Sequence, residues 1–173
     1  GVQTCALPIS PVIEASYRRF LQIMDALIEK QTFVLGSRPS SADFGIYAQL
    51  TQLAKFDPTP MTICLKEAPR VFAWTDVVDD LSGQVCDEDG WIGVSEVKEV
   101  LGPFLEEIGR VYVPALLANA RALQAGDKQM ETTIDGKPWE QPAFPYQGRC
   151  LAWINEEYQK LSSDDRAAVD EIL

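Results

Sequence analysis

The segment from Ser37 to Tyr47 constrains the fold more than any other, because it specifies where a helix begins. It reads Ser-Arg-Pro-Ser-Ser-Ala-Asp-Phe-Gly-Ile-Tyr. Pro39 cannot continue a helix from upstream, and Ser40 can cap a new one. Asp43 stands three residues later, where its carboxylate can reach back to the backbone N–H of Ser40. The spacing therefore predicts a capping box, formed by Ser40 and Asp43, at the start of an amphipathic helix.

Apolar side chains recur at helical spacing both after this box and before it, so each of two helices is predicted to bury one face. The predicted positions of the later helix are Phe44, Tyr47, Leu50, Leu53 and Phe56. Those of the earlier helix are Ile13, Tyr17, Phe20, Met24 and Leu27. We expect Phe20, Met24, Tyr47 and Leu50 to lie in the core.

Two stretches together resemble the C-terminal domain of glutathione S-transferases. Residues 33–44, Phe-Val-Leu-Gly-Ser-Arg-Pro-Ser-Ser-Ala-Asp-Phe, resemble the sequence that opens the central core helix of that domain. Residues 68–74, Ala-Pro-Arg-Val-Phe-Ala-Trp, resemble its helix that starts at a proline and buries a tryptophan. With the helix that precedes both, the resemblance covers roughly residues 11–81. It implies a mainly α fold, a glutathione S-transferase C-terminal-like helical bundle.

Three later stretches resemble the C-terminal extension of a bacterial branch of the same family. They are Gly-Arg-Val-Tyr at 109–112, Ile-Asp-Gly-Lys-Pro-Trp at 134–139 and Phe-Pro-Tyr-Gln at 144–147. Common short transferases do not insert a hairpin after their helical domain. The extension can therefore cover or reshape the usual substrate pocket.

The family resemblance implies an upstream thioredoxin-like βαβ domain that holds glutathione and the residue activating its thiol. The sequence before Pro11 has no alternating strand and helix pattern, no Gly-rich phosphate loop and no Cys-x-x-Cys. No catalytic residue is therefore carried over to this chain. Glutathione is expected as co-substrate of the intact protein. The missing thioredoxin-like domain, a small hydrophobic electrophile and a second copy in a homodimer are the expected partners.

Residues 1–9, Gly-Val-Gln-Thr-Cys-Ala-Leu-Pro-Ile, translate a widely used sequencing-adapter oligonucleotide, so we expect them to be an artefact. Coding sequence would then begin near Ser10, inside a longer gene. The expected domains are 10–128, the helical domain, and 129–173, a hairpin and helical extension packed on it. The sequence stops at Leu173 without a helix cap, so the C-terminal end also looks truncated.

Composition narrows the classes of partner. The chain has 46% hydrophobic and 24% charged residues, as a globular domain does, and no apolar run approaches the length of a membrane span. It has 26 acidic against 15 basic residues, a net charge of -11. This charge disfavours nucleic acid and anionic membrane surfaces as partners.

Histidine and cysteine usage narrows the chemistry. The chain has no histidine, which removes Ser-His-Asp and Cys-His mechanisms and the commonest transition-metal ligand. Outside the suspected artefact, the cysteines are Cys64, Cys86 and Cys150, odd in number and widely spaced. They argue against a disulfide framework or a zinc site and fit a reducing cytoplasm. We expect no metal.

The strongest competing signal is the stretch from Asp87 to Glu96, which resembles an EF-hand calcium loop at several points. Taking Gly90 as the invariant glycine puts Asp87 and Asp89 at ligand positions and Glu96 at the closing position. The first ligand position is then Val85, which has no side-chain oxygen. The alternative interpretation is a solvated acidic connection leading into a helix capped by Ser95.

A long helical pattern follows Glu96 and runs to Leu123, and Pro103 and Pro114 are each predicted to kink it or mark a boundary. Polar or amphipathic groups lie close to its apolar face, at Arg110, Tyr112, Asn119 and Arg121. If the domain helps to bind an electrophilic or acidic ligand, such groups are candidates to contact it, and snorkelling at the surface is the other explanation. We take Tyr47, Arg110, Tyr112 and Asn119 as the candidate substrate-binding residues.

Residues 129–141 no longer show the helical pattern of the preceding segment. Thr132, Thr133 and Ile134 favour a strand, and Asp135-Gly136 is a tight-turn signal, so a small β-hairpin is predicted. Pro138 and Pro142 would limit the returning strand to an edge. A helix with Leu151, Ile154 and Tyr158 on one face should follow. Ser162 and Asp165 have capping-box spacing and predict a last helix.

These inferences predict a fragment of a glutathione S-transferase-like protein that supplies the helical, electrophile-binding half of a glutathione-dependent transferase. Such a fragment alone would be inactive, because thiol activation would belong to the missing domain. The alternative is a non-catalytic protein of the same fold that binds a ligand or a protein through its helical face. Fold alone does not decide between the two.

Overall fold

The structure is a computed structural model that describes residues 9–86 and 88–173. The suspected adapter residues other than Ile9, and Asp87 of the EF-hand-like stretch, lie outside the described residues. The chain divides into two compact units, described separately below. The 17–103 unit is Tyr17–Pro103, and the 104–173 unit is Phe104–Leu173 together with the residues up to Ser16. The domain limits predicted from the sequence, 10–128 and 129–173, stay a prediction.

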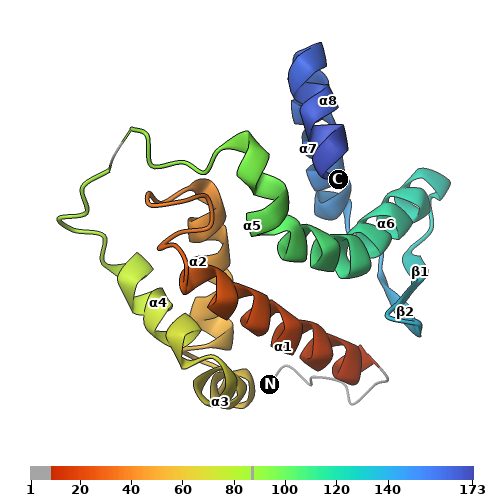
Figure 1. Ribbon diagram of the computed structural model, residues 1–173. Helices are drawn as coiled ribbons and strands as arrows, with labels where there is room; N and C mark the ends of the chain where they lie inside the picture. The colour runs from red at the N-terminus through yellow and green to blue at the C-terminus, as the bar shows by residue number, and fades with distance from the viewer. Residues whose placement is uncertain (1–8, 87) are drawn as a thin grey trace. The chain divides into compact units, whose positions relative to one another are not determined.

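The described chain is mainly α-helical with one small hairpin, as predicted (Figure 1). The elements are α1 (Ile9–Ile28), α2 (Ser41–Leu53), α3 (Pro58–Glu67), α4 (Pro69–Asp79), α5 (Val94–Glu107), the π-helical turn η1 (Ile108–Tyr112), α6 (Val113–Ala125), β1 (Gln129–Ile134), β2 (Lys137–Pro142), α7 (Pro145–Lys160) and α8 (Ser163–Ile172). None of the helices in the described ranges is long and apolar enough to cross a membrane.

The predicted capping box is confirmed and lies inside the core of the 17–103 unit. Ser40 precedes α2 with an extended backbone, and its N–H donates to Asp43 Oδ2 at 2.8 Å. The Ser40 hydroxyl donates to the same oxygen at 2.6 Å, and the N–H of Val34 donates to Asp43 Oδ1 at 2.8 Å. Asp43 is fully buried. The box therefore ties the preceding loop to the start of α2.

Because the Asp43 carboxylate points into the core, the prediction of which face of α2 is buried is wrong. A helix repeats its facing direction after about seven residues, so Asp43 and Leu50 share the buried face. Phe44, one position on, points elsewhere and is 48% exposed. Leu53 and Phe56 are exposed as well, and Tyr47 is only half-buried. Of the predicted apolar positions after the box, Leu50 alone is buried.

The stripe predicted for the first helix is partly correct. Met24 and Leu27 are buried, whereas Tyr17 and Phe20 are half-buried and Ile13 is exposed. The structure buries Val12 and Leu21 in addition. The buried positions are thus rotated slightly from the predicted stripe. Of the four expected core residues, Met24 and Leu50 are confirmed, and Phe20 and Tyr47 are not.

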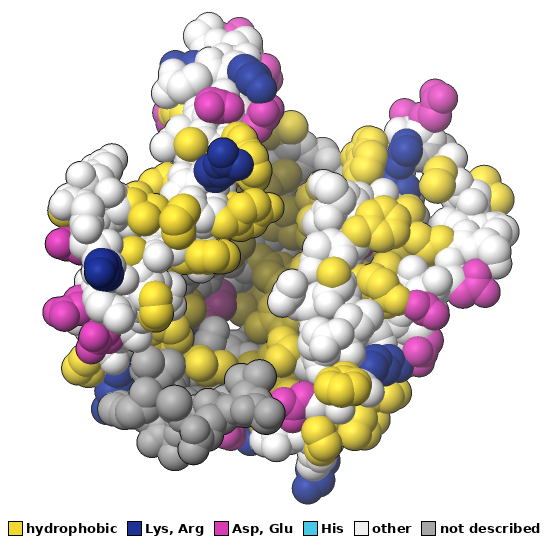
Figure 2. All heavy atoms as spheres, turned by 180° about the vertical axis from the view of Figure 1, so that it is seen from behind, with side chains coloured by type: hydrophobic (Ala, Val, Ile, Leu, Met, Phe, Trp, Pro, Cys, Tyr) yellow, Lys and Arg dark blue, Asp and Glu magenta, His cyan; other side chains and the backbone are white. Residues whose placement is uncertain are grey.

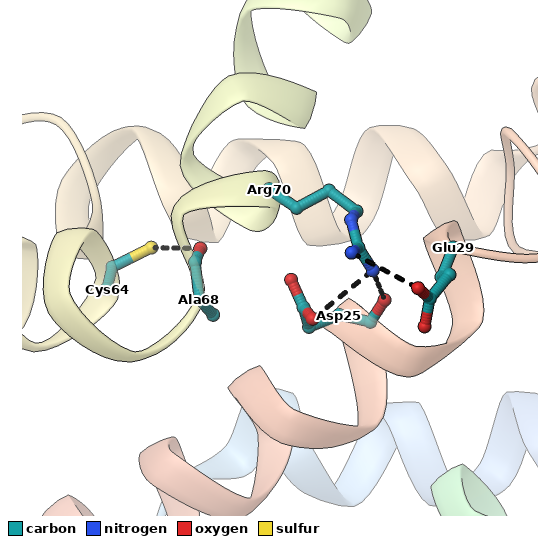
Figure 3. A network of polar contacts seen from close by, with 5 residues as sticks. All are labelled: Asp25, Glu29, Cys64, Ala68 and Arg70. Atoms are coloured by element: carbon teal, nitrogen blue, oxygen red, sulfur yellow. Dashed lines mark hydrogen bonds and ion pairs between the residues drawn. The ribbon is translucent and has the colours of Figure 1, made fainter.

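Helix α4 starts at Pro69 and buries its tryptophan, as predicted. Trp74 is 4% exposed, and its indole Nε1 donates to the backbone oxygen of Thr32 at 2.8 Å. Arg70, near the start of the same helix, donates to the backbone oxygen of Asp25 at 3.0 Å and contacts the carboxylates of Asp25 and Glu29 (Figure 3). These bonds fasten α4 to α1.

The EF-hand-like stretch is part of a backbone clamp. Gly90 O accepts from the N–H of Ser37 at 2.9 Å, and Leu35 O accepts from the N–H of Ile92 at 2.9 Å. Between them, Gly36 and Trp91 form an isolated antiparallel bridge. Helix α5 begins at Val94, and the carboxylate of Glu96 accepts from the N–H of Gly93 at 2.8 Å. The helix therefore starts before Ser95, and the predicted cap at that residue is wrong.

The predicted boundary at Pro114 is confirmed, since η1 ends at Tyr112 and α6 begins at Val113, with Pro114 as its second residue. Pro103 lies inside α5, which continues past it to Glu107. The predicted last helix is also confirmed, because the N–H of Asp165 donates to the Ser162 hydroxyl at 3.1 Å at the start of α8.

The hairpin of the 104–173 unit forms where it was predicted. Ile134 pairs with Lys137, which leaves Asp135 and Gly136 as a turn with φ of 50° and 69°. Two positive φ values identify a type I′ turn. Met130 and Ile134 are almost fully buried, and Met130 packs against Ala118 and Ala122 of α6.

Helix α7 has no buried residue, and Ile154 on its predicted apolar face is 52% exposed. The aromatic side chains Phe144, Tyr146 and Trp153 are also about half exposed, and they contact one another in sequence. Figure 2 shows that hydrophobic side chains reach the surface at many points among the charged ones. Leu151 and Tyr158, which were predicted on the same face as Ile154, are half-buried.

Candidate functional site

The π-helical turn η1 carries two of the candidate residues, Arg110 and Tyr112. π-Helical turns are rare and often occur at functional sites. Arg110 Nε lies 3.7 Å from the carboxylate of Glu107, whose side chain is only 13% exposed. Glu107 in turn accepts a hydrogen bond from the Ser16 hydroxyl at 3.1 Å. The arginine is thus anchored on one edge.

The Arg110 side chain is 54% exposed. A guanidinium has five N–H donors in a planar fork, so an Nε contact with Glu107 leaves the outer edge free to face a ligand. A carboxylate or another planar anion is the group that this edge fits best. Sequence reasoning did not use Glu107 or Ser16, although the spacing of Glu107 and Arg110 is that of neighbours on a helix.

Tyr112 is 42% exposed. Burial raises the pKa of Tyr112, and the nearby thiol of Cys150 raises it further. The phenol is therefore neutral at physiological pH and available as a hydrogen-bond donor. It is a weak candidate for an acid or base, because its pKa is moved away from neutrality.

Asn119 has a different environment from the one expected of a ligand-binding residue. It is fully buried, its Nδ2 donates to Phe144 O at 3.0 Å, and its Oδ1 accepts from the Phe144 N–H at 2.7 Å. Both ends of the amide thus hold the backbone that leads into α7. A role of Asn119 in binding substrate stays a prediction, and its position in α6 gave no sequence signal for this clamp.

Tyr47 lies in the 17–103 unit, and its hydroxyl donates to the carboxylate of Asp79. This hydrogen bond is the main reason that the pKa of Tyr47 is raised. A neighbouring polar contact joins the turn after α2 to α4, because Lys55 Nζ lies 2.8 Å from Asp76 and over the ring of Phe72. Tyr47 therefore takes part in the packing of α2 on α4.

The candidates do not form one cluster within either unit. Asn119 is fully buried in α6 and bonds to Phe144, whereas Arg110 and Tyr112 are partly exposed on η1. Tyr47 belongs to the other unit. Arg121, the fourth polar residue of the same helical run, lines a shallow depression between α6 and β1.

The described cysteines are free. Cys64 is fully buried, its Sγ points to Ala68 O at 3.8 Å, and burial raises the pKa of its thiol (Figure 3). A buried thiol of raised pKa is a poor nucleophile. Cys86 is exposed. In the described ranges there is no group of three or more side chains that could hold a metal ion.

Comparison with known protein families finds a match for one part of the chain. Residues 11–76 match the family model described as glutathione S-transferase, C-terminal domain. The match covers both helices of the predicted resemblance, the capping box and the start of α4. No curated protein and no solved structure matched the chain.

Proposed function

Since residues 11–76 match the family model of the glutathione S-transferase C-terminal domain, we propose that the chain is the helical, electrophile-binding half of a glutathione-dependent transferase. The family match is the observation that carries this proposal. In the intact protein a thioredoxin-like domain would hold glutathione as co-substrate and lower the pKa of its thiol, because the thiolate is the nucleophile. The electrophile would be small and hydrophobic. The chain alone would not catalyse conjugation.

Within this proposal Arg110 and Tyr112 are the residues best suited to touch a ligand. Both belong to the π-helical turn, both side chains are partly exposed, and together they offer a cation and a neutral donor. Tyr47 and Asn119 remain candidates, although the hydroxyl of the first and the amide of the second have partners within the chain. Cytoplasmic location and homodimer formation, which is common in the family, belong to the same proposal.

The alternative function is a non-catalytic module of the same fold that binds a ligand or a protein. The internal hydrogen bonds of Tyr47 and Asn119 favour it, because the polar groups of two of the four candidates already have partners within the chain and so contribute less to a substrate pocket. The two functions differ in what the gene encodes ahead of Ser10.

The test begins with the coding sequence upstream of the codon for Ser10. We expect it to encode a thioredoxin-like domain with a Ser, Tyr or Cys near its first helix. The joined protein should conjugate glutathione to 1-chloro-2,4-dinitrobenzene, and the 173-residue chain should not. An upstream domain without such a residue, together with no conjugation, would establish the binding module instead.

Arg110→Ala and Arg110→Lys in the joined protein then separate a ligand contact from a structural role. Loss of the guanidinium should raise KM for an electrophile that carries a carboxylate by about ten-fold and leave KM for a neutral electrophile unchanged. Equal effects on both electrophiles would mean that Arg110 acts through the fold. Lys98→Ala, at an exposed position of α5, is the matched loss of a surface cation.

A further inference from the structure

The two outer edges of the hairpin differ in the backbone hydrogen-bond donors that they expose, and the pairing register determines which residues lie on each edge. The N–H of Ala143 donates to Lys128 O at 2.9 Å, and Ile134 closes the turn opposite Lys137. Hydrogen-bonded pairs alternate with non-hydrogen-bonded ones in an antiparallel ladder. The even-numbered residues of β1 therefore bond to β2. The backbone groups of Gln129, Glu131 and Thr133 point away from it.

On β2 the outward positions are Pro138, Glu140 and Pro142. A proline has no N–H, so two of the three outward positions of this edge cannot donate to another strand. On β1 each outward position keeps its N–H. Of the contacts in the described part of the chain, none joins these N–H groups of Gln129, Glu131 and Thr133 to an acceptor. The side chains of all three are exposed.

A depression of about 660 Å³ lies beside this open edge, between α6 and the first half of β1. Its apolar floor includes Ala118, Ala122 and Met130, and its rim carries charged side chains. The charges on the rim are those of Arg121, Asp127, Lys128 and Glu131, and no ion pair joins them to one another in the described residues. On the side of the sheet that faces α6, an apolar recess thus lies next to the outward backbone N–H groups of β1.

We propose that β1 binds an extended peptide of a partner protein, which adds a third strand beside Gln129, Glu131 and Thr133. In such β-addition the main-chain bonds give affinity, and alternate side chains give specificity. The peptide residues that face α6 place an apolar side chain over Ala118 and Ala122. Those that face solvent lie beside Glu131, where a basic side chain makes a favourable cross-strand pair.

A second copy of the chain fits this edge less well. Pairing β1 with its own copy about Glu131 sets two carboxylates directly opposite, which is unfavourable. Met130 and Ile134 of that copy are already buried in its own core and are unable to fill the recess. The net charge of -11 on each chain also opposes self-association. A basic and apolar peptide meets none of these obstacles.

The test uses the full chain and an acetylated peptide of alternating lysine and valine, six residues long. Hydrogen exchange followed by NMR should show that the amides of Glu131 and Thr133 exchange at least ten-fold more slowly when the peptide is added. The amides of Met130 and Thr132, which already bond to β2, should change little. The same peptide with N-methylated alternate amides should fail to protect Glu131 and Thr133, and this control leaves the protein unaltered.

Thr133→Pro tests the same bond from the protein side, because it imitates the native prolines of β2 and removes an outward N–H. It should abolish peptide binding, whereas Thr133→Ala should bind as the parent chain does. Unchanged shifts of the Met130 and Ile134 methyl groups would show that the hairpin persists.

Several results would overturn the proposal. One is that Glu131 and Thr133 are as strongly protected as Met130 and Thr132 without peptide, since the edge would then be covered. Another is equal binding of the N-methylated peptide. A peptide of alternating glutamate and valine that binds equally well would refute the assigned charge preference. A concentration-dependent dimer that Thr133→Pro abolishes would assign the edge to a second copy.

Discussion

The carboxylate of Asp43 accepts a hydrogen bond from the backbone N–H of Val34, nine residues earlier, at 2.8 Å. Its other oxygen accepts from the N–H and the hydroxyl of Ser40. One buried side chain thus fixes both the start of α2 and the loop that precedes it. The sequence pattern accounts for the bonds to Ser40, whereas the bond to Val34 depends on how the loop folds back.

Asp43→Ala should therefore cost more stability than Ser40→Ala. The first change leaves two buried backbone N–H groups without acceptors and should lower the free energy of unfolding by about 3–5 kcal/mol. The second leaves the carboxylate with both backbone donors and should cost about 1 kcal/mol. Urea unfolding followed by circular dichroism measures both, with Ser41→Ala on the exposed first turn as control. Equal losses in the two variants would refute the central role of Asp43.

Gly36→Ala should be strongly destabilising. Gly36 has a φ of 132°, and a Cβ built on it would lie 2.2 Å from Gly90 O. An alanine there would have to break the clamp between residues 35–37 and 90–92, at a cost of about 3 kcal/mol. Gly45→Ala is the matched control, because Gly45 lies in α2 with no atom near its Cβ position. That change should stabilise by about 0.5–1 kcal/mol.

Thermal unfolding of the two glycine variants gives a clear contrast. Parent-like stability of Gly36→Ala would mean that the clamp does not form in solution. A second readout is the fluorescence of Trp91, which lies under the guanidinium of Arg38 at 4.6 Å. The Trp91 side chain is already 45% exposed, so opening the clamp should shift its emission only slightly further to longer wavelength.

Alkaline pH should weaken the fold through Tyr17. Burial, and then the neighbouring thiol of Cys64, raises the pKa of Tyr17 above its ordinary value of about 10. A folded-state pKa that is raised stabilises the protein fully below the unfolded value, and the contribution is lost as pH rises through the folded value. The free energy of unfolding should therefore fall above about pH 10. Burial raises the pKa of Cys64 as well, with the same sign.

Urea unfolding between neutral and alkaline pH checks this expectation. Tyr17→Phe should show a shallower fall than the parent chain, because the variant has no phenol to ionise at this position. Tyr146→Phe is the matched control, since Tyr146 is 56% exposed. If Tyr17→Phe followed the same pH dependence as the parent, Tyr17 would not be the group that links ionisation to unfolding.

Local signals predicted the ends of elements better than their buried faces. Ser40 with Asp43, Ser162 with Asp165, and Asp135-Gly136 each act over three or four residues, and each forms the expected cap or turn. Such signals depend on backbone hydrogen bonds within the same segment, so tertiary packing overrides them less often, although the predicted cap at Ser95 does not form.

The predictions of buried helix faces were wrong where a polar side chain points into the core. Phe44 is more exposed than expected because Asp43 occupies the core side of α2. Hydrophobic periodicity counts a carboxylate as an outward residue and has no means to detect a buried acceptor. Tyr47 and Asn119 were chosen as ligand contacts for their chemistry, yet their partners, Asp79 and Phe144, lie on elements far along the chain. Long-range pairing of this kind has no local signal.

Asn119→Ala should loosen the connection between β2 and α7 without unfolding α6. It removes an acceptor from the Phe144 N–H and a donor to its carbonyl, in a fully buried position, and should cost about 2 kcal/mol. Asn119→Asp is informative as well. Its carboxylate still accepts from the Phe144 N–H, but it has no donor for the Phe144 carbonyl and places a negative charge beside that oxygen. Asn119→Asp should destabilise the chain at neutral pH, and part of the lost stability should be recovered as acid protonates the new carboxyl.

Gln124→Ala, on the exposed side of α6, is the control for both Asn119 variants. Faster exchange of the Phe144 amide in Asn119→Ala, with the amides of Ala118 and Ala122 unchanged, would localise the effect. If instead this variant kept its stability and lost binding of an electrophile in the joined protein, Asn119 would belong to the substrate site and the clamp would be incidental.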